Sequence, residues 1–260
     1  MIIDIHTHVF PDKIAEKASR GIQEFYNIRV PYDGTLSKLL ELSDRAGVDK
    51  VVIHSPATTP HQVESINNFI IECTQKYPDR IIGFMTMHPD YDDINGEVER
   101  CIDAGLKGLK IHPDFQEFMI DDKKAYNIYE AISGRLPLLV HTGDYRYQWS
   151  KPSRMANVMD DFPAMQVIGA HFGGWSEWDD AVEAFSGRNI YIDTSSTMYK
   201  VPIEHVNNLI RAYGVDHVLF GTDYPMWDAE TELKFIEQLD VTSSEREMIL
   251  HENTERLLGI

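Results

Sequence analysis

Eight short runs of apolar and β-branched residues recur along this chain, each with turn signals at its carboxyl end. Segments of helical period lie between most of these runs. Strands that alternate with helices form a parallel sheet, because a parallel neighbour is reached only through a crossover connection. The expected strands cover residues 2–5, 50–54, 81–87, 107–112, 137–141, 166–171, 190–193 and 217–223.

The expected helices carry their own start and stop signals. The segment 35–46 begins at a capping threonine, Thr35, and stops before Gly47. Pro78 ends the segment 62–77, because the residue before a proline disfavours helical geometry. The remaining expected helices cover residues 94–104, 123–132, 202–213 and 243–258.

Successive strand ends lie about 30 residues apart, which is the size of one βα unit. Eight such units occupy nearly the whole chain, so we predict a single (β/α)8 TIM barrel over residues 1–260. Residues 9–34 are expected to form a loop insertion, with a short helix, after the first strand. A doubly wound open sheet is the rival, but no Gly-x-Gly-x-x-Gly turn follows any strand.

The charge of the chain excludes two classes of partner. Its 260 residues include 42 acidic and 24 basic side chains, for a formal net charge of −18. Nucleic acid and anionic membrane surfaces both attract a positive field, so neither is expected as a partner. We find no secretory signal, no membrane-span pattern and no metal-ligand spacing around Cys73 or Cys101. These features predict a cytoplasmic protein, and a homodimer is left open.

Histidines and an aspartate stand at the carboxyl ends of expected strands, where a parallel barrel carries its functional residues. His6 and His8 are two positions apart on one strand, so both imidazoles point to the same side and can bind one metal ion. His141, His171 and Asp223 each follow an apolar strand and precede a loop that contains glycine or proline. The pattern therefore predicts a metal-dependent site at one end of the barrel.

Five sequence blocks together resemble the amidohydrolase superfamily, in its "amidohydrolase 2" branch, which also contains the aminocarboxymuconate-semialdehyde decarboxylase group. The blocks are Asp4-Ile5-His6-Thr7-His8, Gly108-Leu109-Lys110-Ile111-His112-Pro113, Val140-His141-Thr142-Gly143, Ala170-His171-Phe172-Gly173-Gly174 and Phe220-Gly221-Thr222-Asp223-Tyr224-Pro225. They occur in the same order as in that branch and span essentially the whole chain.

The resemblance implies one divalent metal ion held by His6, His8, His141 and Asp223. Zinc is expected first, with manganese, iron or cobalt as alternatives. It also implies catalytic roles for His171, as a general base or in orienting a metal-bound water, and for Asp223, as a proton acceptor. An ion shared by His6 and Asp223 requires the first and last strands to be neighbours, so this ligand set predicts a closed barrel.

Four residues are candidates for contact with substrate. Arg146, in the loop after the fifth strand, can pair bidentately with a carboxylate, and solvated loop charge is the alternative. Trp175 and Tyr199 follow the sixth and seventh strands and either wall a pocket or pack under the loops. His112 ends the fourth strand and either touches substrate or lies behind the site.

Three further strand residues have weaker assignments. Asp4 either orients a metal-bound imidazole or pairs with the backbone. Lys110 lies on the fourth strand, but we find no pattern for a carboxylated lysine that holds a second metal. His54 is expected to cap or pack rather than to act in the site.

The leading functional hypothesis is a metal-dependent, amidohydrolase-type hydrolase that attacks a small, carboxylated molecule with metal-activated water. The alternative is a metal-dependent, non-oxidative decarboxylase, a carboxy-lyase of an aromatic or unsaturated acid, because both reactions use the same metal ligands. A barrel that only binds metal is the least favoured hypothesis, because structural zinc sites are usually closed by four protein ligands that include cysteines.

Overall fold

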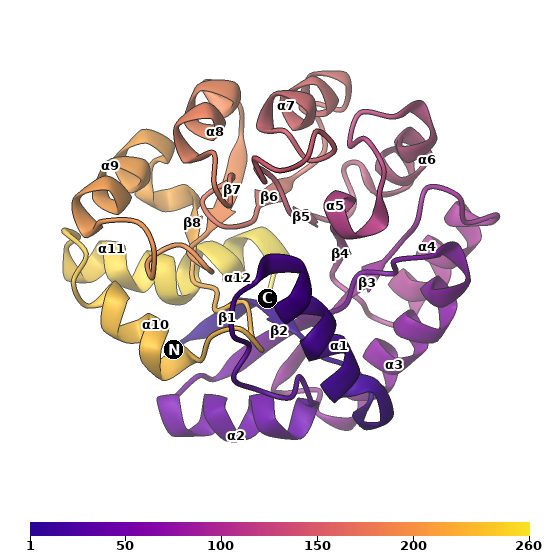
Figure 1. Ribbon diagram of the computed structural model, residues 1–260, viewed down its shortest axis with the longest axis horizontal. Helices are drawn as coiled ribbons and strands as arrows, with labels where there is room; N and C mark the ends of the chain where they lie inside the picture. Colours follow the sequence, from indigo (N-terminus) through magenta and orange to yellow (C-terminus); the bar gives the residue numbers. More distant parts are fainter.

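The chain forms a ring of eight parallel strands in sequence order, with helices on the outside (Figure 1). This computed structural model describes residues 1–260. Each strand pairs in parallel with the next, as the predicted alternation of strands and helices requires. The strands are β1 (Ile3–His8), β2 (Lys50–His54), β3 (Ile81–Thr86), β4 (Gly108–Ile111), β5 (Leu138–Val140), β6 (Val167–Gly169), β7 (Ile190–Asp193) and β8 (Val218–Leu219).

The barrel closes between β1 and the segment that follows β8. The Ile5 amide donates to the Phe220 carbonyl at 2.9 Å, and the His8 amide donates to the Tyr224 carbonyl at 2.7 Å. The Asp223 amide in turn donates to the His6 carbonyl at 2.8 Å. The first and last strands are therefore neighbours, and the predicted (β/α)8 TIM barrel is confirmed.

The helices confirm most of the predicted segments and add others. Thr35 caps α2 by accepting from the Lys38 amide, and Gly47 ends that helix in the left-handed region at φ 74°. The helices are α1 (Asp12–Tyr26), α2 (Leu36–Ala46), α3 (Val63–Lys76), α4 (Ile94–Asp103), α5 (Pro113–Gln116), α6 (Lys123–Ile132), α7 (Pro152–Asp161), α8 (Trp178–Phe185), α9 (Ile203–Tyr213), α10 (Ala229–Ile236), α11 (Ser243–Glu247) and α12 (Asn253–Leu258). Short turns at η1 (Pro60–Gln62) and η2 (Val215–His217) and a π-helical turn at η3 (Met248–Glu252) complete the secondary structure.

The segment 9–34, expected to be mainly loop, instead contains the 15-residue helix α1. Its buried residues Ala15, Ser19, Ile22 and Tyr26 follow one another at helical spacing. Figure 1 shows α1 in the foreground, near the ends of β1 and β2. The long connection after β1 therefore brings a regular apolar helix face to the end of the barrel that carries the predicted site.

Two apolar cores hold the barrel. The inner one lies inside the ring and includes Ile5, Val52 and Phe84, with Leu257 and Leu258 of α12 packed against it. The outer one fills the layer between strands and helices and contains 53 buried residues. Such a filled interior leaves the strand ends as the place for polar chemistry.

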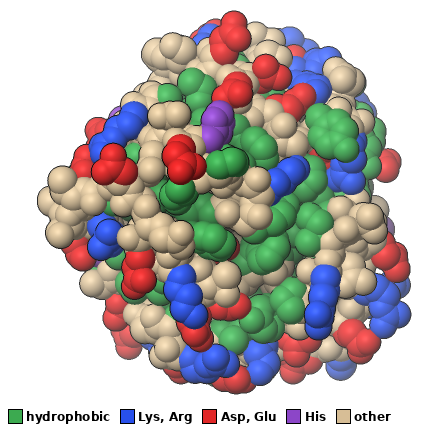
Figure 2. All heavy atoms as spheres, turned by 60° about the vertical axis from the view of Figure 1, so that its left-hand side comes forward, with side chains coloured by type: hydrophobic (Ala, Val, Ile, Leu, Met, Phe, Trp, Pro, Cys, Tyr) green, Lys and Arg blue, Asp and Glu red, His purple; other side chains and the backbone are tan.

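The surface mixes both signs of charge despite the net charge of −18. Figure 2 shows a face on which hydrophobic side chains gather in a hollow bordered by acidic and basic side chains. None of the helices is long and apolar enough to cross a membrane.

Candidate metal centre

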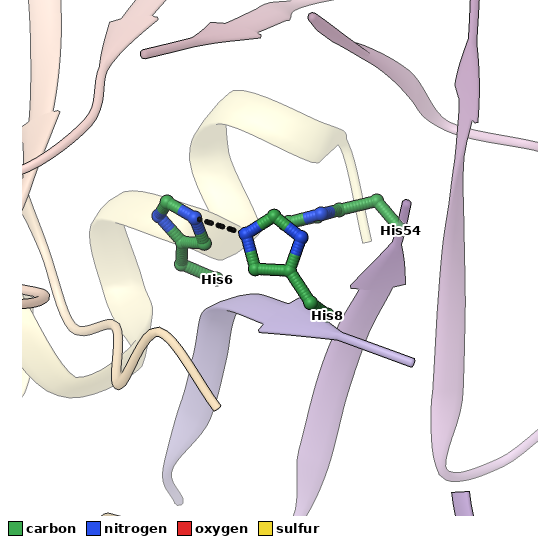
Figure 3. A group of neighbouring side chains, drawn as sticks. All are labelled: His6, His8 and His54. Atoms are coloured by element: carbon green, nitrogen blue, oxygen red, sulfur yellow. Dashed lines mark hydrogen bonds between the residues drawn. The ribbon is translucent and has the colours of Figure 1, made fainter. Parts of the chain in front are cut away.

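His6, His8 and Asp223 meet at the carboxyl ends of β1 and β8. Their facing atoms form a nearly equilateral triangle: the two histidine Nε2 atoms are 3.2 Å apart, and Oδ1 of Asp223 lies 3.4 Å from His6 and 3.3 Å from His8. Figure 3 shows the two imidazoles of β1 turned toward each other. The predicted convergence of first-strand histidines with Asp223 is present in the structure.

The triangle fits a divalent metal ion. Ligand bonds of about 2.0–2.2 Å around one ion separate neighbouring donor atoms by about 3.0–3.4 Å. Burial lowers the pKa of His6 and of His8, so both imidazoles are neutral. Burial opposes ionisation of Asp223, but its contacts with His6 and His8 outweigh burial and hold the pKa of the carboxyl below its usual value. Neutral imidazole and ionised carboxylate are the forms that bind metal.

A β-bulge sets the aim of the β1 histidines. Asp4 pairs with Val51 of β2, but the next regular pair joins Thr7 to Ile53, so β1 has one extra residue between these pairs. A bulge bends its strand and redirects side chains, which is why bulges recur beside functional sites. In this barrel the bulge contains His6 and precedes His8.

The turns that carry Asp223 and His171 have unusual backbone geometry. Asp223 has φ 65° and His171 has φ 59°, both in the left-handed region that non-glycine residues rarely occupy. Ser196, which also has a positive φ, donates from its hydroxyl to Oδ2 of Asp223 at 2.5 Å. Strained backbone is kept where the surrounding structure enforces it, and here it positions groups at the triangle.

Asp193, at the end of β7, was not among the predicted residues. Its Oδ2 accepts from Nδ1 of His6 at 2.8 Å. Its Oδ1 accepts from the backbone amides of His171 at 3.1 Å and Ser195 at 3.0 Å. One carboxylate thus fixes both a candidate metal ligand and the turn that carries His171.

Asp4 pairs with the backbone and not with an imidazole. Its Oδ1 accepts from the amides of His6 at 3.1 Å and Thr222 at 3.0 Å, and its Oδ2 accepts from the Thr222 hydroxyl at 2.7 Å. Of the two predicted roles, the structure supports backbone pairing. Asp4 ties β1 to the turn that carries Asp223, while Asp193 orients the imidazole.

His171 lies beside the triangle with a defined tautomer. Its Nδ1 donates to the Ser195 carbonyl at 3.1 Å, so Nε2 carries the lone pair of the neutral ring. Nε2 lies 3.1 Å from Nδ1 of His141. Burial lowers the pKa of His171. This geometry suits the predicted role of His171 in proton transfer.

His141 lies apart from the predicted ligand set. Its ring contacts His171, and it stacks on His112 with ring centroids 4.0 Å apart. Its Nε2 is buried without a hydrogen-bond partner, 3.6 Å from Oδ2 of Asp114. The structure therefore places no His141 nitrogen within hydrogen-bond distance of the triangle, and its role as a ligand stays a prediction.

Arg146 is engaged within the protein. Its Nε and Nη2 donate to the buried carboxylate of Asp144 at 2.6–3.1 Å, and its Nη1 donates to the Phe25 carbonyl at 2.7 Å. The guanidinium also lies 5.4 Å from the ring centre of Trp175. Arg146 thus joins α1 to the loop after β5, and its guanidinium donors are engaged by Asp144 and Phe25.

The other predicted substrate residues divide into one that lines the site and two that pack nearby. His112 accepts from the Phe115 amide at Nδ1 and lies 2.8 Å from the Tyr26 hydroxyl at Nε2, so the ring is held on both sides. Trp175 is buried against Tyr26, and Tyr199 packs on Trp227. For these two aromatics the structure supports packing.

A small cavity lies directly over the triangle. Its lining combines Ile22 and Tyr26 of α1, Phe115 and Met226 with the polar side chains of His6, His8, Lys110, His112, His171 and Asp223. A second cavity of about 620 Å³ runs beside α1 and shares His8, Ile22 and Phe115 with the first. A pocket of that size holds a small organic molecule, and its position offers a path to the triangle.

Two fully buried residues, His54 and Lys110, lie beside the β1 histidines. His54 pairs in register with His8, and Figure 3 shows its ring beside that of His8. Neither ring nitrogen of His54 has a hydrogen-bond partner, so of the two roles expected for it, capping and packing, the structure supports packing. Nζ of Lys110 lies 3.2 Å from Nε2 of His6, and burial lowers the pKa of this lysine to about 8. Each residue ends or occupies a strand, which was the available signal.

Comparisons with known proteins agree with this geometry. A sequence profile of the family described as "Amidohydrolase" matches residues 3–260. A 2-keto-4-carboxy-3-hexenedioate hydratase from a Sphingobium species is 24% identical, over 99% of this chain and 96% of the relative. A 2-amino-3-carboxymuconate-6-semialdehyde decarboxylase from Caenorhabditis elegans is 22% identical, over 99% of this chain and 94% of the relative.

The fold also matches solved structures. One is a dihydroxybenzoic acid decarboxylase from a Polaromonas species, crystallised with bound manganese and the inhibitor 2-nitroresorcinol. It superimposes with a TM-score of 0.76 at 18% identity, over 99% of this chain and 96% of that one. At this identity the match supports the barrel fold.

Proposed function

The chain belongs to the amidohydrolase family, and on that premise we propose that it is a metal-dependent, non-oxidative decarboxylase of a small aromatic or unsaturated carboxylic acid. The relatives described above include decarboxylases and a hydratase that act on carboxylates. Hydrolysis, the leading hypothesis from the sequence, has no specific support among them. The decarboxylase alternative fits better.

The observation that carries this proposal is the apolar cover over the His6, His8 and Asp223 triangle. Ile22, Phe115 and Met226 line the cavity there, so a substrate carboxylate would leave water on binding. A charged carboxylate is destabilised in such surroundings, whereas carbon dioxide and the neutral product are not. The environment therefore favours loss of the carboxylate.

The reaction needs an electrophile and a proton. His6, His8 and Asp223 would hold a divalent ion, which would supply an electrophile for the anionic oxygens of the substrate. The bond between carbon and carboxylate breaks, the electron pair stays on the carbon, and a proton forms the new C–H bond there. Nε2 of His171, which lines the same cavity and carries the lone pair of the neutral ring, would take up a proton from water and deliver it to that carbon.

The metal is proposed to be divalent, with zinc and manganese as the first ions to test. The family resemblance suggested zinc, whereas the Polaromonas decarboxylase was crystallised with manganese. Imidazole and carboxylate ligands accept both ions, so the donor set does not discriminate between them.

A reconstitution assay tests the function. Metal-free protein is loaded with Mn²⁺ or Zn²⁺ and incubated with hydroxybenzoates and muconate-type acids in D₂O. We expect carbon dioxide release, and one deuterium at the vacated carbon of the product. Release of no carbon dioxide from any acid, together with ¹⁸O transfer from water into a cleaved ester, amide or lactone, would contradict the proposal.

His171 provides a matched test of proton transfer. His171→Asn should keep the bound metal but lower kcat by about 10²–10⁴-fold, because the variant lacks the proton carrier. His205→Asn is the control, because His205 lies on α9, away from the strand ends. A fully active His171→Asn enzyme would remove His171 from the mechanism.

A further inference from the structure

Lys110 is a lysine with too few partners. It lies on β4 and is fully buried. Its Nζ makes one hydrogen bond, to Nε2 of His6 at 3.2 Å. An ammonium group has three donors, and burial of a charge is costly unless the charge is paired and hydrogen-bonded. Two of the three donors of Lys110 thus have no acceptor.

Metal binding would remove the one partner that Lys110 has. Nε2 of His6 is one of the three atoms that converge at the triangle, and its lone pair cannot both bind a metal and accept a hydrogen bond. In the metal-loaded protein Nζ therefore needs a new acceptor. No other protein atom accepts from Nζ, so that acceptor is water or a molecule bound in the cavity.

The kind of acceptor follows from the donor. A buried ammonium group is stabilised best by an anion that accepts from its free donors. Asp4, Asp193 and Asp223 all lie around the triangle, but none of them accepts a hydrogen bond from Nζ of Lys110. An anionic group on a bound molecule would fill that place.

Lys110 is also the only lysine or arginine that lines the cavity over the triangle. Arg146, predicted from the sequence to receive a carboxylate, is bound to Asp144 instead. Lys110 and the triangle of His6, His8 and Asp223 thus face the same small cavity.

We propose that Nζ of Lys110 binds the carboxylate of an anionic substrate in the metal-loaded site. This assignment rests on the proposed function for its substrate class and adds the residue that selects the acid over its neutral analogues. A hydrogen bond from a charged donor to a carboxylate is strong, so it offsets part of the desolvation cost that the apolar side chains impose when the acid binds. Lys110 is thereby a specificity-determining residue.

Binding measurements test the assignment without turnover. Dissociation constants of 2-hydroxybenzoate and of its neutral analogue 2-hydroxybenzamide are measured by calorimetry on Mn²⁺-loaded protein, with metal content determined for each sample. We expect Lys110→Met to bind the acid about 10- to 100-fold more weakly and the amide as before. Lys107→Met is the control, because Lys107 is exposed just before β4.

The Lys110→Gln variant keeps a hydrogen-bond donor without the charge, so its affinity for the acid should lie between those of wild type and Lys110→Met. It also keeps the test valid if Lys110→Met misfolds. Unchanged preference for the acid in a metal-loaded Lys110 variant would overturn the assignment. A lysine carbamate signal in the ¹³C spectrum of protein equilibrated with ¹³C-bicarbonate would also overturn it, because a carbamate is an anion. Charge-selective binding without decarboxylation would refute the proposed reaction alone.

Discussion

Nδ1 of His6 lies 2.8 Å from Oδ2 of Asp193, although 187 positions separate the two residues in the chain. Both side chains are fully buried. A carboxylate accepts and never donates when ionised, so the imidazole proton sits on Nδ1. The lone pair at Nε2 is therefore directed at His8 and Asp223.

Replacing Asp193 should weaken metal binding. Asp193→Asn keeps the size of the side chain but removes the charge that orients His6, and loss of such a partner typically lowers metal affinity about 10- to 100-fold. Competition with a chromophoric chelator measures the dissociation constant for Mn²⁺ or Zn²⁺. Asp92→Asn, at an exposed position after β3, is the control. Equal affinity in the Asp193 and Asp92 variants would show that the hydrogen bond does not support the ion.

The sequence predicted the convergence of His6, His8 and Asp223, but not the residue that orients His6. His6, His8 and Asp223 follow apolar strands, and parallel strands bring their carboxyl ends to one edge. Asp193 also ends a strand, but its role depends on which side of the barrel it faces. That facing depends on strand register, and the β1 bulge between Asp4 and Thr7 shows how register departs from simple alternation. The side of the barrel that Asp193 faces therefore could not be predicted from the sequence.

Asp114 should make the stability of the metal-free protein depend on pH. Burial raises the pKa of Asp114 to about 7, and a hydrogen bond from Ser150 opposes this only in part. The folded state therefore holds the proton up to about pH 7, whereas the unfolded chain releases it near pH 4. The stabilisation that this residue contributes is full below about pH 4 and is lost as the pH rises to about 7.

The Asp114→Asn variant isolates this effect. The free energy of unfolding in urea is measured at pH 5 and pH 8 with chelator present, and wild type should lose stability relative to the variant by about 1.4 kcal/mol for each unit of pKa shift within that window. Asp92→Asn should track wild type at both pH values. A difference between wild type and Asp114→Asn that does not vary with pH would mean that Asp114 is ionised throughout.

Arg146 should contribute to stability more than to substrate binding. In Arg146→Met the buried Asp144 carboxylate loses its charged partner, at a cost of about 2–3 kcal/mol in unfolding free energy. The double variant Arg146→Met/Asp144→Asn should recover part of this, because no unpaired charge remains. Chemical denaturation measures both. A large loss of 2-hydroxybenzoate affinity in Arg146→Met, with stability intact, would restore the carboxylate-binding role predicted from the sequence.

Parts of the fold were predictable for a physical reason that also explains the main error. Segments such as α6 have both an apolar stripe and clear ends, and the predicted bounds 123–132 match the structure. The helix α1 has an equally regular buried stripe, but Pro11 at its start provides no side-chain cap. Its position after β1 also suggested a long loop. The helical spacing from Ala15 to Tyr26 was the stronger signal.

Gly143 should be the least replaceable residue of the loop after β5. It has φ 80°, and a Cβ atom there would lie 2.4 Å from the Gly174 Cα atom, in the loop that follows His171. Gly47, with φ 74° and open space around the same position, is the matched control. Gly47→Ala should cost about 1 kcal/mol from backbone strain alone, and Gly143→Ala should cost more by at least about 1–3 kcal/mol, because overpacking adds to the strain. Urea unfolding compares the two variants. Equal losses would mean that the loops after β5 and β6 move apart easily, and would contradict a rigid support for His141 and His171.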